Sequence, residues 1–185
     1  FTGISGFVLA GTNYIDSNTV ANKGYQSMYG TNSRGIWTQI NNIRHNLVHH
    51  FGYGSGISYD SGLVPVNITQ NEVYAGNGSG ISFQGAGTTT GSITKNKVHH
   101  LIGSGLRLEV TGYYLDPAIG DIVVANNMVA LGFDENGAPI TNDESLIGIN
   151  HQLGAKMKII NNSVFIGGSG VVNSFGGGSR AMSLN

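Results

Sequence analysis

Two short sequence words alternate along this chain, and their order constrains the fold more than any other feature. The first word is Ile-x-x-Asn-x-Val, with Val124 in place of Ile in the fifth copy, and its amides are Asn18, Asn46, Asn71, Asn96, Asn127 and Asn162. The second word is a glycine followed by alternating apolar residues, and we place its copies at Gly6, Gly35, Gly56, Gly80, Gly105, Gly148 and Gly170. A fixed period of this size indicates stacked structural repeats.

The spacing of apolar residues within each repeat predicts strands. Apolar side chains fall at every second position, in short runs rich in Ile and Val that Gly and Asn interrupt. Asn tolerates the left-handed backbone that a sharp bend needs, so we expect each repeat to turn at its Asn. Repeats stacked at the ~4.8 Å strand spacing would bring these amides into a hydrogen-bonded ladder.

On these two words, from about residue 6 to residue 172, the chain resembles the right-handed parallel β-helix proteins of the pectate-lyase-like superfamily. The resemblance implies an all-β, single-stranded right-handed parallel β-helix of about six to seven coils with an Asn-ladder bend. Because the whole chain shares one repeating core, we expect a single domain over residues 1–185. No capping helix is predicted at either end, so we expect a segment of a longer solenoid or end-to-end stacking of subunits.

Composition excludes several classes of partner. Charged residues make up only 10% of the chain and the formal net charge is −1, so we expect no nucleic-acid partner. No apolar stretch approaches 18 residues, so we expect no membrane span. The chain has no Cys. The resemblance implies an extracellular or cell-surface location.

Alternation along the Gly-initiated strands assigns side chains to two faces. The first residue after each Gly should point into the core: Phe7, Ile36, Ile57, Ile81, Leu106, Ile149 and Val171. The third should also point inward, which gives Thr38, Tyr59, Phe83, Leu108 and His151, and for His151 we expect a hydrogen-bonded core histidine. The second and fourth residues should form an outward polar face, which includes Trp37, Asp60, Gln84, Arg107 and Glu109.

Asp60 and Glu109 are catalytic candidates on that face. They lie two coils apart, or roughly 9–10 Å at the usual strand spacing. This is near the upper end of the separation between the acid and the base of inverting glycosidases. Arg107 could bind a sugar carboxylate or neutralise an anion. The alternative is a solvated sheet face on which Arg107 pairs with a neighbouring carboxylate.

A second candidate group follows the Val of the first word. The residue after Val should point outward, which places His49 and His99 on either side of Tyr74. Either histidine could act as general base or proton shuttle. The alternative is plain aromatic stacking, and at ~10 Å His49 and His99 are too far apart to share one metal ion.

Several further residues could bind substrate or a cation. Trp37 and the inserted Tyr113 and Tyr114 could stack on sugar rings, and Gln84 and Tyr74 complete the set of predicted substrate-binding residues. The insertion that contains Asp134-Glu135-Asn136-Gly137 and Asp143-Glu144 suggests Ca²⁺, although it does not fit the EF-hand pattern. We otherwise expect no metal and no cofactor.

The resemblance, together with these candidate residues, implies a protein that acts on or binds polysaccharide, as a lyase or glycoside hydrolase, along the outward face of the Gly-initiated strands. Two alternatives remain open. One is a structural β-solenoid module of a surface filament, adhesin or viral fibre that associates with itself end to end or laterally and has no catalytic activity. The other is a glycan-binding module without turnover. The expected partner is therefore a polysaccharide, a glycan or another copy of the chain.

Overall fold

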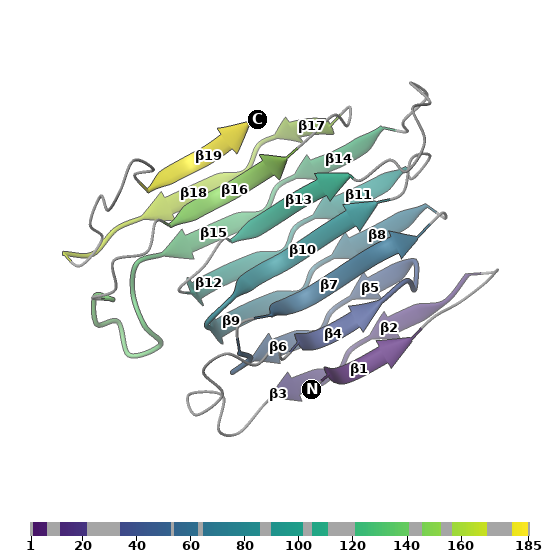
Figure 1. Ribbon diagram of the computed structural model, residues 1–185, viewed down its shortest axis with the longest axis horizontal. Coiled ribbons are helices and arrows are strands. Elements are labelled where there is room, and N and C mark those ends of the chain that lie inside the picture. The colour runs from purple at the N-terminus through teal and green to yellow at the C-terminus, as the bar shows by residue number, and fades with distance from the viewer. Residues whose placement is uncertain are drawn as a thin grey trace.

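The computed structural model describes residues 2–6, 12–21, 34–52, 54–62, 65–85, 90–101, 105–110, 121–140, 146–152, 157–169 and 179–184. These residues form nineteen strands and contain no helix (Figure 1). None of the described segments is therefore a helix that could cross a membrane.

The strands form three parallel sheets. Sheet A contains β1 (Thr2–Gly6), β4 (Arg34–Thr38), β7 (Ser55–Gly62), β10 (Ser79–Gly85), β13 (Leu106–Val110), β16 (Ile147–Gln152) and β19 (Arg180–Leu184). Sheet B contains β2 (Tyr14–Asp16), β5 (Asn42–Arg44), β8 (Val66–Thr69), β11 (Gly91–Thr94), β14 (Ile122–Ala125) and β17 (Met157–Ile160). Sheet C contains β3 (Thr19–Ala21), β6 (Leu47–His49), β9 (Glu72–Gly76), β12 (Lys97–Leu101), β15 (Met128–Leu131) and β18 (Ser163–Ile166).

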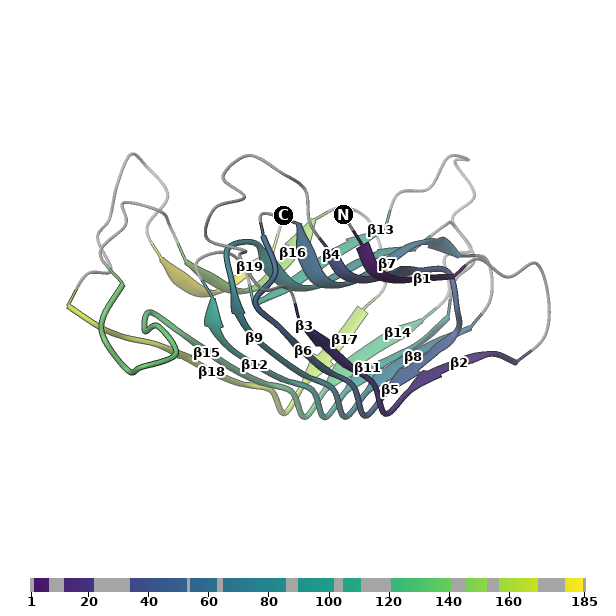
Figure 2. The ribbon, with the colours of Figure 1, turned by 90° about the horizontal axis from the view of Figure 1, so that it is seen from below.

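The chain visits the three sheets in a fixed order. Each passage runs through A, B and C and then returns to the neighbouring strand of A, and we call one such passage a rung. The bends between sheets B and C lie one behind another along the lower edge of Figure 2. An all-β chain of stacked parallel strands is what the two sequence words predict, and it is consistent with a β-solenoid.

The predicted Asn ladder is confirmed. The side-chain amide Nδ2 of each ladder Asn donates to Oδ1 of the ladder Asn in the next rung, over 2.9–3.0 Å, from Asn18 through Asn162. The same Oδ1 atoms accept the backbone N–H of the Asn in the preceding rung at 2.9–3.0 Å. Because the central amides are buried, this ladder supplies the partners that buried polar groups require.

The left-handed residue of each bend is the one before the ladder Asn, which corrects our expectation. Positive φ angles of 53° to 57° occur at Ser17, His45, Gln70, Lys95, Asn126 and Asn161. The ladder Asn itself keeps ordinary backbone, since its role is to place an amide along the stack. The six residues that adopt the left-handed conformation are all polar but differ in size and charge, so this position does not require an Asn.

The glycines of the second word have a steric cause. A Cβ added to Gly35, Gly56, Gly80, Gly105 or Gly148 would meet Cγ1 of the Val in the sheet C strand of the same rung at 2.3 Å. It would also meet the backbone oxygen of the next residue in that column at 2.6–2.8 Å. The two sequence words therefore describe one contact, in which sheet A and sheet C approach too closely for a side chain.

The first and last copies of the second word were placed incorrectly. β1 pairs Ile4 with Ile36, so Gly3, not Gly6, begins the column, and Phe7 lies outside the described residues. At the other end β19 aligns Met182 with Ile149, which puts Ala181 at the glycine position. No sheet C strand follows β19 among the described residues, so no Val contacts Ala181 there. Gly170 and Val171 lie outside the described residues.

Among the described side chains the inward columns are otherwise as predicted except at His151, and the side chains of Leu106 and Leu108 lie outside the described part of the structure. Ile36, Ile57, Ile81 and Ile149 are completely buried, and so are Tyr59 and Phe83, whose rings stack with centroids 5.4 Å apart. Burial raises the pKa of Tyr59 to about 12. These columns fill the space between the sheets and fix the direction of every outward side chain.

Candidate functional site

The outward face of sheet A carries two aligned rows of positions. Strand pairing places Trp37, Ser58, Ser82, Arg107, Asn150 and Ser183 in the first row. It places Asp60, Gln84, Glu109 and Gln152 in the second row. The predicted register of Asp60, Gln84 and Glu109 is therefore confirmed, whereas their catalytic and binding roles stay predictions. The side chains of Arg107 and Glu109, together with all of Tyr113 and Tyr114, lie outside the described part of the structure.

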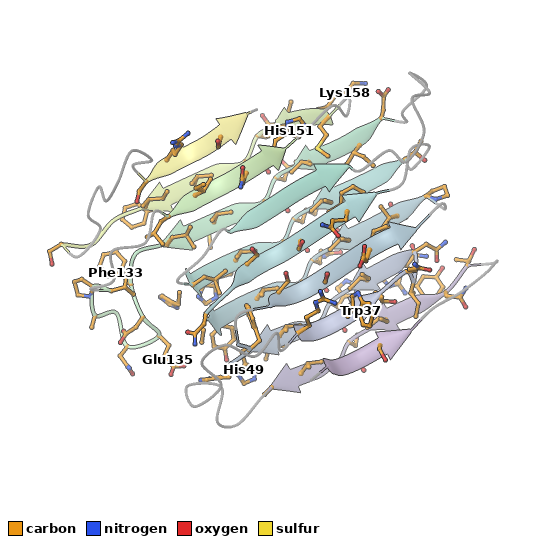
Figure 3. All side chains as sticks on the ribbon, viewed as in Figure 1. Trp37, His49, Phe133, Glu135, His151 and Lys158 are labelled. Carbon is orange, nitrogen blue, oxygen red and sulfur yellow. The ribbon has the colours of Figure 1, made fainter. Side chains whose placement is uncertain are left out.

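Trp37 links the two rows. Its Nε1–H donates to Oδ2 of Asp60 at 3.4 Å, and the guanidinium carbon of Arg34 lies 4.9 Å from the centre of the Trp37 ring (Figure 3). An aromatic ring with a cation on one side and a carboxylate at its edge presents apolar surface and hydrogen-bonding groups within one small area. This corner of sheet A combines the two kinds of surface that a sugar ring requires.

The small polar residues of the first row are recessed. Ser58, Ser82, Asn150 and Ser183 point away from the core, yet only 6–8% of each residue is exposed. Hydroxyl and amide groups therefore lie low on this face at these four positions. They could hydrogen-bond to an extended, hydroxyl-rich ligand.

The outward face of sheet C carries a second, aromatic group. The Tyr74 ring is sandwiched between His49 and His99, with ring centroids 4.9 and 5.2 Å apart and planes within 4° of parallel. The predicted outward column is thus present, and it consists of stacked rings. Each ring sits one rung from the next, which places the two histidines on opposite sides of the tyrosine, as the spacing predicted.

Sequence analysis missed the neighbours of these two histidines. Alternation alone would send His50 and His100 to the opposite face from His49 and His99. The backbone at His50 and His100 instead has φ of 55° and 54°, which turns both side chains outward. As a result Nδ1 of His49 lies 2.6 Å from Nδ1 of His50, and Nδ1 of His99 lies 2.8 Å from Nδ1 of His100.

Each histidine pair has a carboxylate partner. Nε2 of His99 lies 2.9 Å from Oε1 of Glu72, which also binds Nζ of Lys97 at 2.7 Å. Nε2 of His50 lies 3.0 Å from Oε2 of Glu135. The Lys97 and His99 hydrogen bonds lower the pKa of Glu72, so this carboxylate stays ionised at neutral pH.

Burial dominates the charge state of the inner histidines. It lowers the pKa of His99 against the opposing effect of Glu72, and it lowers the pKa of His49 with help from the nearby His50. Both rings are therefore neutral at pH 7. His99 uses both ring nitrogens within the cluster, and its role as general base or proton shuttle stays a prediction.

The 132–140 turn brings Glu135 to His50. Oδ1 of Asp134 accepts the backbone N–H groups of Asn136 and Ala138 at 2.9 and 2.8 Å, and these bonds lower the pKa of Asp134. The Phe133 ring stacks on Phe165 of β18 at 6.2 Å. Asp134 thus stabilises the turn. Asp143 and Glu144, the rest of the suggested calcium site, lie outside the described residues, and the described chain gathers no three His, Asp or Glu side chains around one point.

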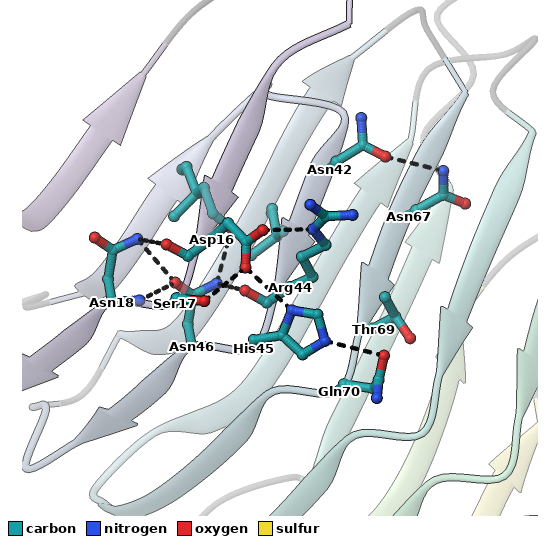
Figure 4. Close-up of polar contacts among 12 residues, drawn as sticks. Asp16, Ser17, Asn18, Asn42, Arg44, His45, Asn46, Asn67, Thr69 and Gln70 are labelled. Atoms are coloured by element: carbon teal, nitrogen blue, oxygen red, sulfur yellow. Dashed lines mark hydrogen bonds and ion pairs between the residues drawn. The ribbon is translucent and has the colours of Figure 1, made fainter.

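A third polar cluster stands at the sheet B edge of the ladder. Asp16 binds Nε of Arg44 at 2.6 Å and Nδ1 of His45 at 3.0 Å, and Nε2 of His45 lies 3.2 Å from Oε1 of Gln70 (Figure 4). The Arg44 and His45 hydrogen bonds lower the pKa of Asp16 to about 2. The side chains of Arg44 and His45 are nearly half exposed, as expected for surface residues.

His151 lies on the inward column, but it is not the hydrogen-bonded core histidine that we expected. Pairing aligns His151 with Leu108 and Leu184. Its Nε2 is buried and has no hydrogen-bond partner among the described residues. The residue as a whole is only partly buried, because it stands near the last rungs of the stack.

Comparisons of this chain with protein-family models, with curated proteins and with solved structures gave no match.

Proposed function

We propose that this chain is a right-handed parallel β-helix of about six to seven coils that binds polysaccharide along the outward face of sheet A. Right-handedness is supported by the general rule for connections between parallel strands of one sheet. An extracellular or cell-surface location belongs to the same proposal. The observation that carries it is the recessed polar row of Ser58, Ser82 and Asn150 beside Trp37.

Three properties of that face favour a glycan over other ligands. The recessed row offers hydroxyl and amide groups at the fixed interval of the strands, which suits a polymer with regularly spaced hydroxyls. The Trp37 ring offers an apolar face at one end of the row. The low charge of the chain argues against a polyanion held by many cations, such as a nucleic acid.

Catalysis on the bound glycan is a further step of the proposal. Asp60 and Glu109 occupy the same row two strands apart with Gln84 between them, a spacing near the upper end of that in which a water fits between the acid and the base of inverting glycosidases. In that arrangement one carboxyl group would protonate the leaving oxygen and the other would activate water. The proton from the attacking water would pass to the base.

A binding screen with matched aromatic variants tests the proposal. We expect wild-type chain to bind at least one polysaccharide in a panel of acidic and neutral polymers, measured by titration calorimetry. Trp37→Ala should weaken binding at least tenfold. Tyr14→Ala is the control, because Tyr14 is an exposed aromatic beside an arginine on sheet B. Equal losses in both variants, or no binding by wild type, would refute the proposal.

The catalytic step is tested separately on the polymer that binds. Asp60→Asn and Glu109→Gln should abolish the release of new reducing ends while leaving binding within about threefold of wild type. Turnover that persists in both variants would remove these carboxylates from the mechanism without affecting the binding proposal. Absence of turnover in wild type would leave a glycan-binding module.

The structural alternative has one observation in its favour. On β17 and β18 the inward Met157, Ile159, Val164 and Ile166 are only partly buried, whereas the corresponding residues one rung earlier are 0–1% exposed. Apolar surface of this kind is covered when another layer of strands stacks on it. A concentration-dependent rise in mass by light scattering, lost in Ile159→Lys, would support the alternative; a monomer at all concentrations would oppose it.

A further inference from the structure

The two His-His pairs on sheet C share a geometry that a hydrogen bond does not require. In both, the Nδ1 atoms of consecutive residues converge to 2.6 and 2.8 Å while the rings stand at 71° and 80° to each other. N–H donors usually lie about 2.7–3.2 Å from their acceptors. Two imidazole nitrogens bound to one cation at ~2.0–2.1 Å would be roughly 2.9 Å apart at the right angle of a square-planar Cu²⁺ site and roughly 3.3 Å apart at the tetrahedral angle of Zn²⁺, so each pair would open slightly to bind the cation.

The other ring nitrogen supports the same interpretation. A metal-binding histidine usually donates its second N–H to a carboxylate, which fixes the ring and its tautomer. Glu72 occupies that position at Nε2 of His99, and Glu135 occupies it at Nε2 of His50. Donation from Nε2 leaves Nδ1 of each of these rings as an unprotonated ligand atom that faces its neighbouring histidine.

The backbone makes this convergence a repeated feature. His50, Ala75 and His100 follow the outward residue of three successive sheet C strands, and all three have φ between 52° and 55°. The same local conformation therefore occurs with a His-His pair in two rungs and with Tyr74-Ala75 in the rung between them. The intervening rung therefore has the same backbone conformation at Ala75 but no pair of histidines to bind a metal ion.

The charges around the two pairs do not oppose the binding of a cation. Glu72 and Lys97 are the charged groups next to His99, and Asp134 is the one near His100. Glu135 is the charged group next to His50. The carboxylates offset the charge of an added cation.

We propose that His49 with His50, and His99 with His100, each bind one late first-row divalent cation, Zn²⁺ or Cu²⁺, through their two Nδ1 atoms. Imidazole nitrogen favours these metals over Ca²⁺ and Mg²⁺, which prefer oxygen ligands. The pairs lie two rungs apart, or roughly 10 Å, so the two cations are bound independently. No third His, Asp or Glu of the described chain joins either pair, so water or a small ligand completes each coordination sphere.

Metal titration of the whole chain tests the inference. With ZnCl₂ or CuSO₄ as the probe at pH 7.5, titration calorimetry should give two equivalents for wild type, one for His50→Ala, one for His100→Ala and none for the double variant. Copper bound to wild type should show nitrogen coupling in its electron paramagnetic resonance spectrum. CaCl₂ should give no heat of binding above that of the double variant.

Two variants separate a metal role from a structural one. Glu72→Gln should weaken the site at His99 and His100 by 10–100-fold and leave the other equivalent unchanged. His45→Ala, on the sheet B side of the bend, should keep both equivalents. Circular dichroism of each variant shows whether the strands remain.

The overturning results are specific. If wild type binds Zn²⁺ and Cu²⁺ no better than the folded double variant, each pair merely shares a proton between its two Nδ1 atoms. If His45→Ala removes an equivalent and His50→Ala does not, the cation is bound elsewhere. Neither result bears on glycan binding, since Trp37 lies on sheet A.

Discussion

Removal of one amide from the middle of the Asn ladder should destabilise the chain far more than removal of one from its end. Asn71 is 1% exposed, and its Oδ1 accepts two hydrogen bonds from Asn46, one from the backbone N–H and one from Nδ2. Its own Nδ2 donates to Oδ1 of Asn96 and to the carbonyls of Ile43 and Thr69. Asn71→Ala removes all of these bonds without adding bulk.

The expected magnitude follows from the groups that are left behind. Asn96 still accepts from the backbone N–H of residue 71, and Nδ2 of Asn46 still reaches the carbonyls of Ile15 and Arg44. The backbone N–H of Asn46 loses the acceptor that the ladder provides, and an unsatisfied buried donor costs about 1–3 kcal/mol. With about 1 kcal/mol for the remaining lost bonds, the free energy of unfolding should fall by about 2–4 kcal/mol.

Asn18→Ala is the matched control at the end of the ladder. Asn18 donates through Nδ2 to Oδ1 of Asn46 and to the carbonyl of Asp16, and Asn18 is only partly buried. Its backbone N–H keeps the bond to Oδ1 of Asn46. Because water can reach the groups that it leaves, we expect a loss of only about 1 kcal/mol.

Equilibrium unfolding in urea, followed by far-ultraviolet circular dichroism, measures both losses. Comparison of the slopes with denaturant shows whether the whole stack or only part of it unfolds, since repeat proteins can lose rungs separately. Losses that agree within about 0.5 kcal/mol for Asn71→Ala and Asn18→Ala would refute the argument that burial makes the ladder stabilising.

Three further predictions concern sterics and charge. Gly80→Ala should lower the free energy of unfolding by about 1–3 kcal/mol, because its Cβ would meet Cγ1 of Val98 at 2.3 Å and the Gly105 carbonyl at 2.7 Å. Adding Val98→Ala to the same chain should restore only part of the lost stability, and urea unfolding measures both changes. Asp16→Asn should lower the melting temperature at pH 6 but not near pH 2: the folded pKa of Asp16 lies below its ordinary 3.8, so its stabilisation is present above that value and is lost as pH falls through about 2. The pKa of His99 is lowered below its ordinary 6.5 in the folded chain, so the unfolded chain binds the proton more readily as pH falls. Stability should therefore decrease as pH drops below 6.5. His99→Phe should reduce this dependence of the melting temperature on pH.

The interior of the stack was predictable because its causes are periodic. An Asn that hydrogen-bonds to the same residue one rung away must recur, and an Ile column between sheets must alternate with period 2. Gly80 and Val98 are each visible in the sequence as a repeated letter. That they are one contact is visible only when the two sheets are placed together.

The ends of the stack were less predictable because neighbours decide them. Gly3 and Gly6 both flank the strand around Ile4, and local pattern does not choose between them. Which glycine begins the column is decided by the pairing of Ile4 with Ile36 and by Val20, whose Cγ1 would lie 2.5 Å from a Cβ at residue 3. Ala181 occupies a glycine position at the other end for the complementary reason, that no Val contacts it among the described residues.

The candidate metal sites were hidden from the sequence by two separate effects. A left-handed residue breaks the alternation that assigns faces, so alternation did not place His50 and His100 on the outward face of sheet C. The contact of Glu135 with His50 depends on a turn that reaches back over three rungs, and neither the period nor composition encodes its direction. Glu72, by contrast, lies one rung from Lys97 in register, so the pairing of unlike charges there follows from the repeat.

The ladder also explains how the two proposed kinds of site, for glycan and for metal, could share one scaffold. The buried Asn and Ile columns fix the backbone without using any outward residue, so the faces of sheets A and C are free to vary one position at a time. On sheet C the outward column changes from His49 to Tyr74 to His99 while the strands keep their register. Substitution on one face should therefore leave the other unaffected: Trp37→Ala should bind Zn²⁺ as wild type does, and His50→Ala should bind glycan as wild type does. Coupling of more than about 0.5 kcal/mol between them in a double-mutant cycle would show that the stack transmits strain between its faces.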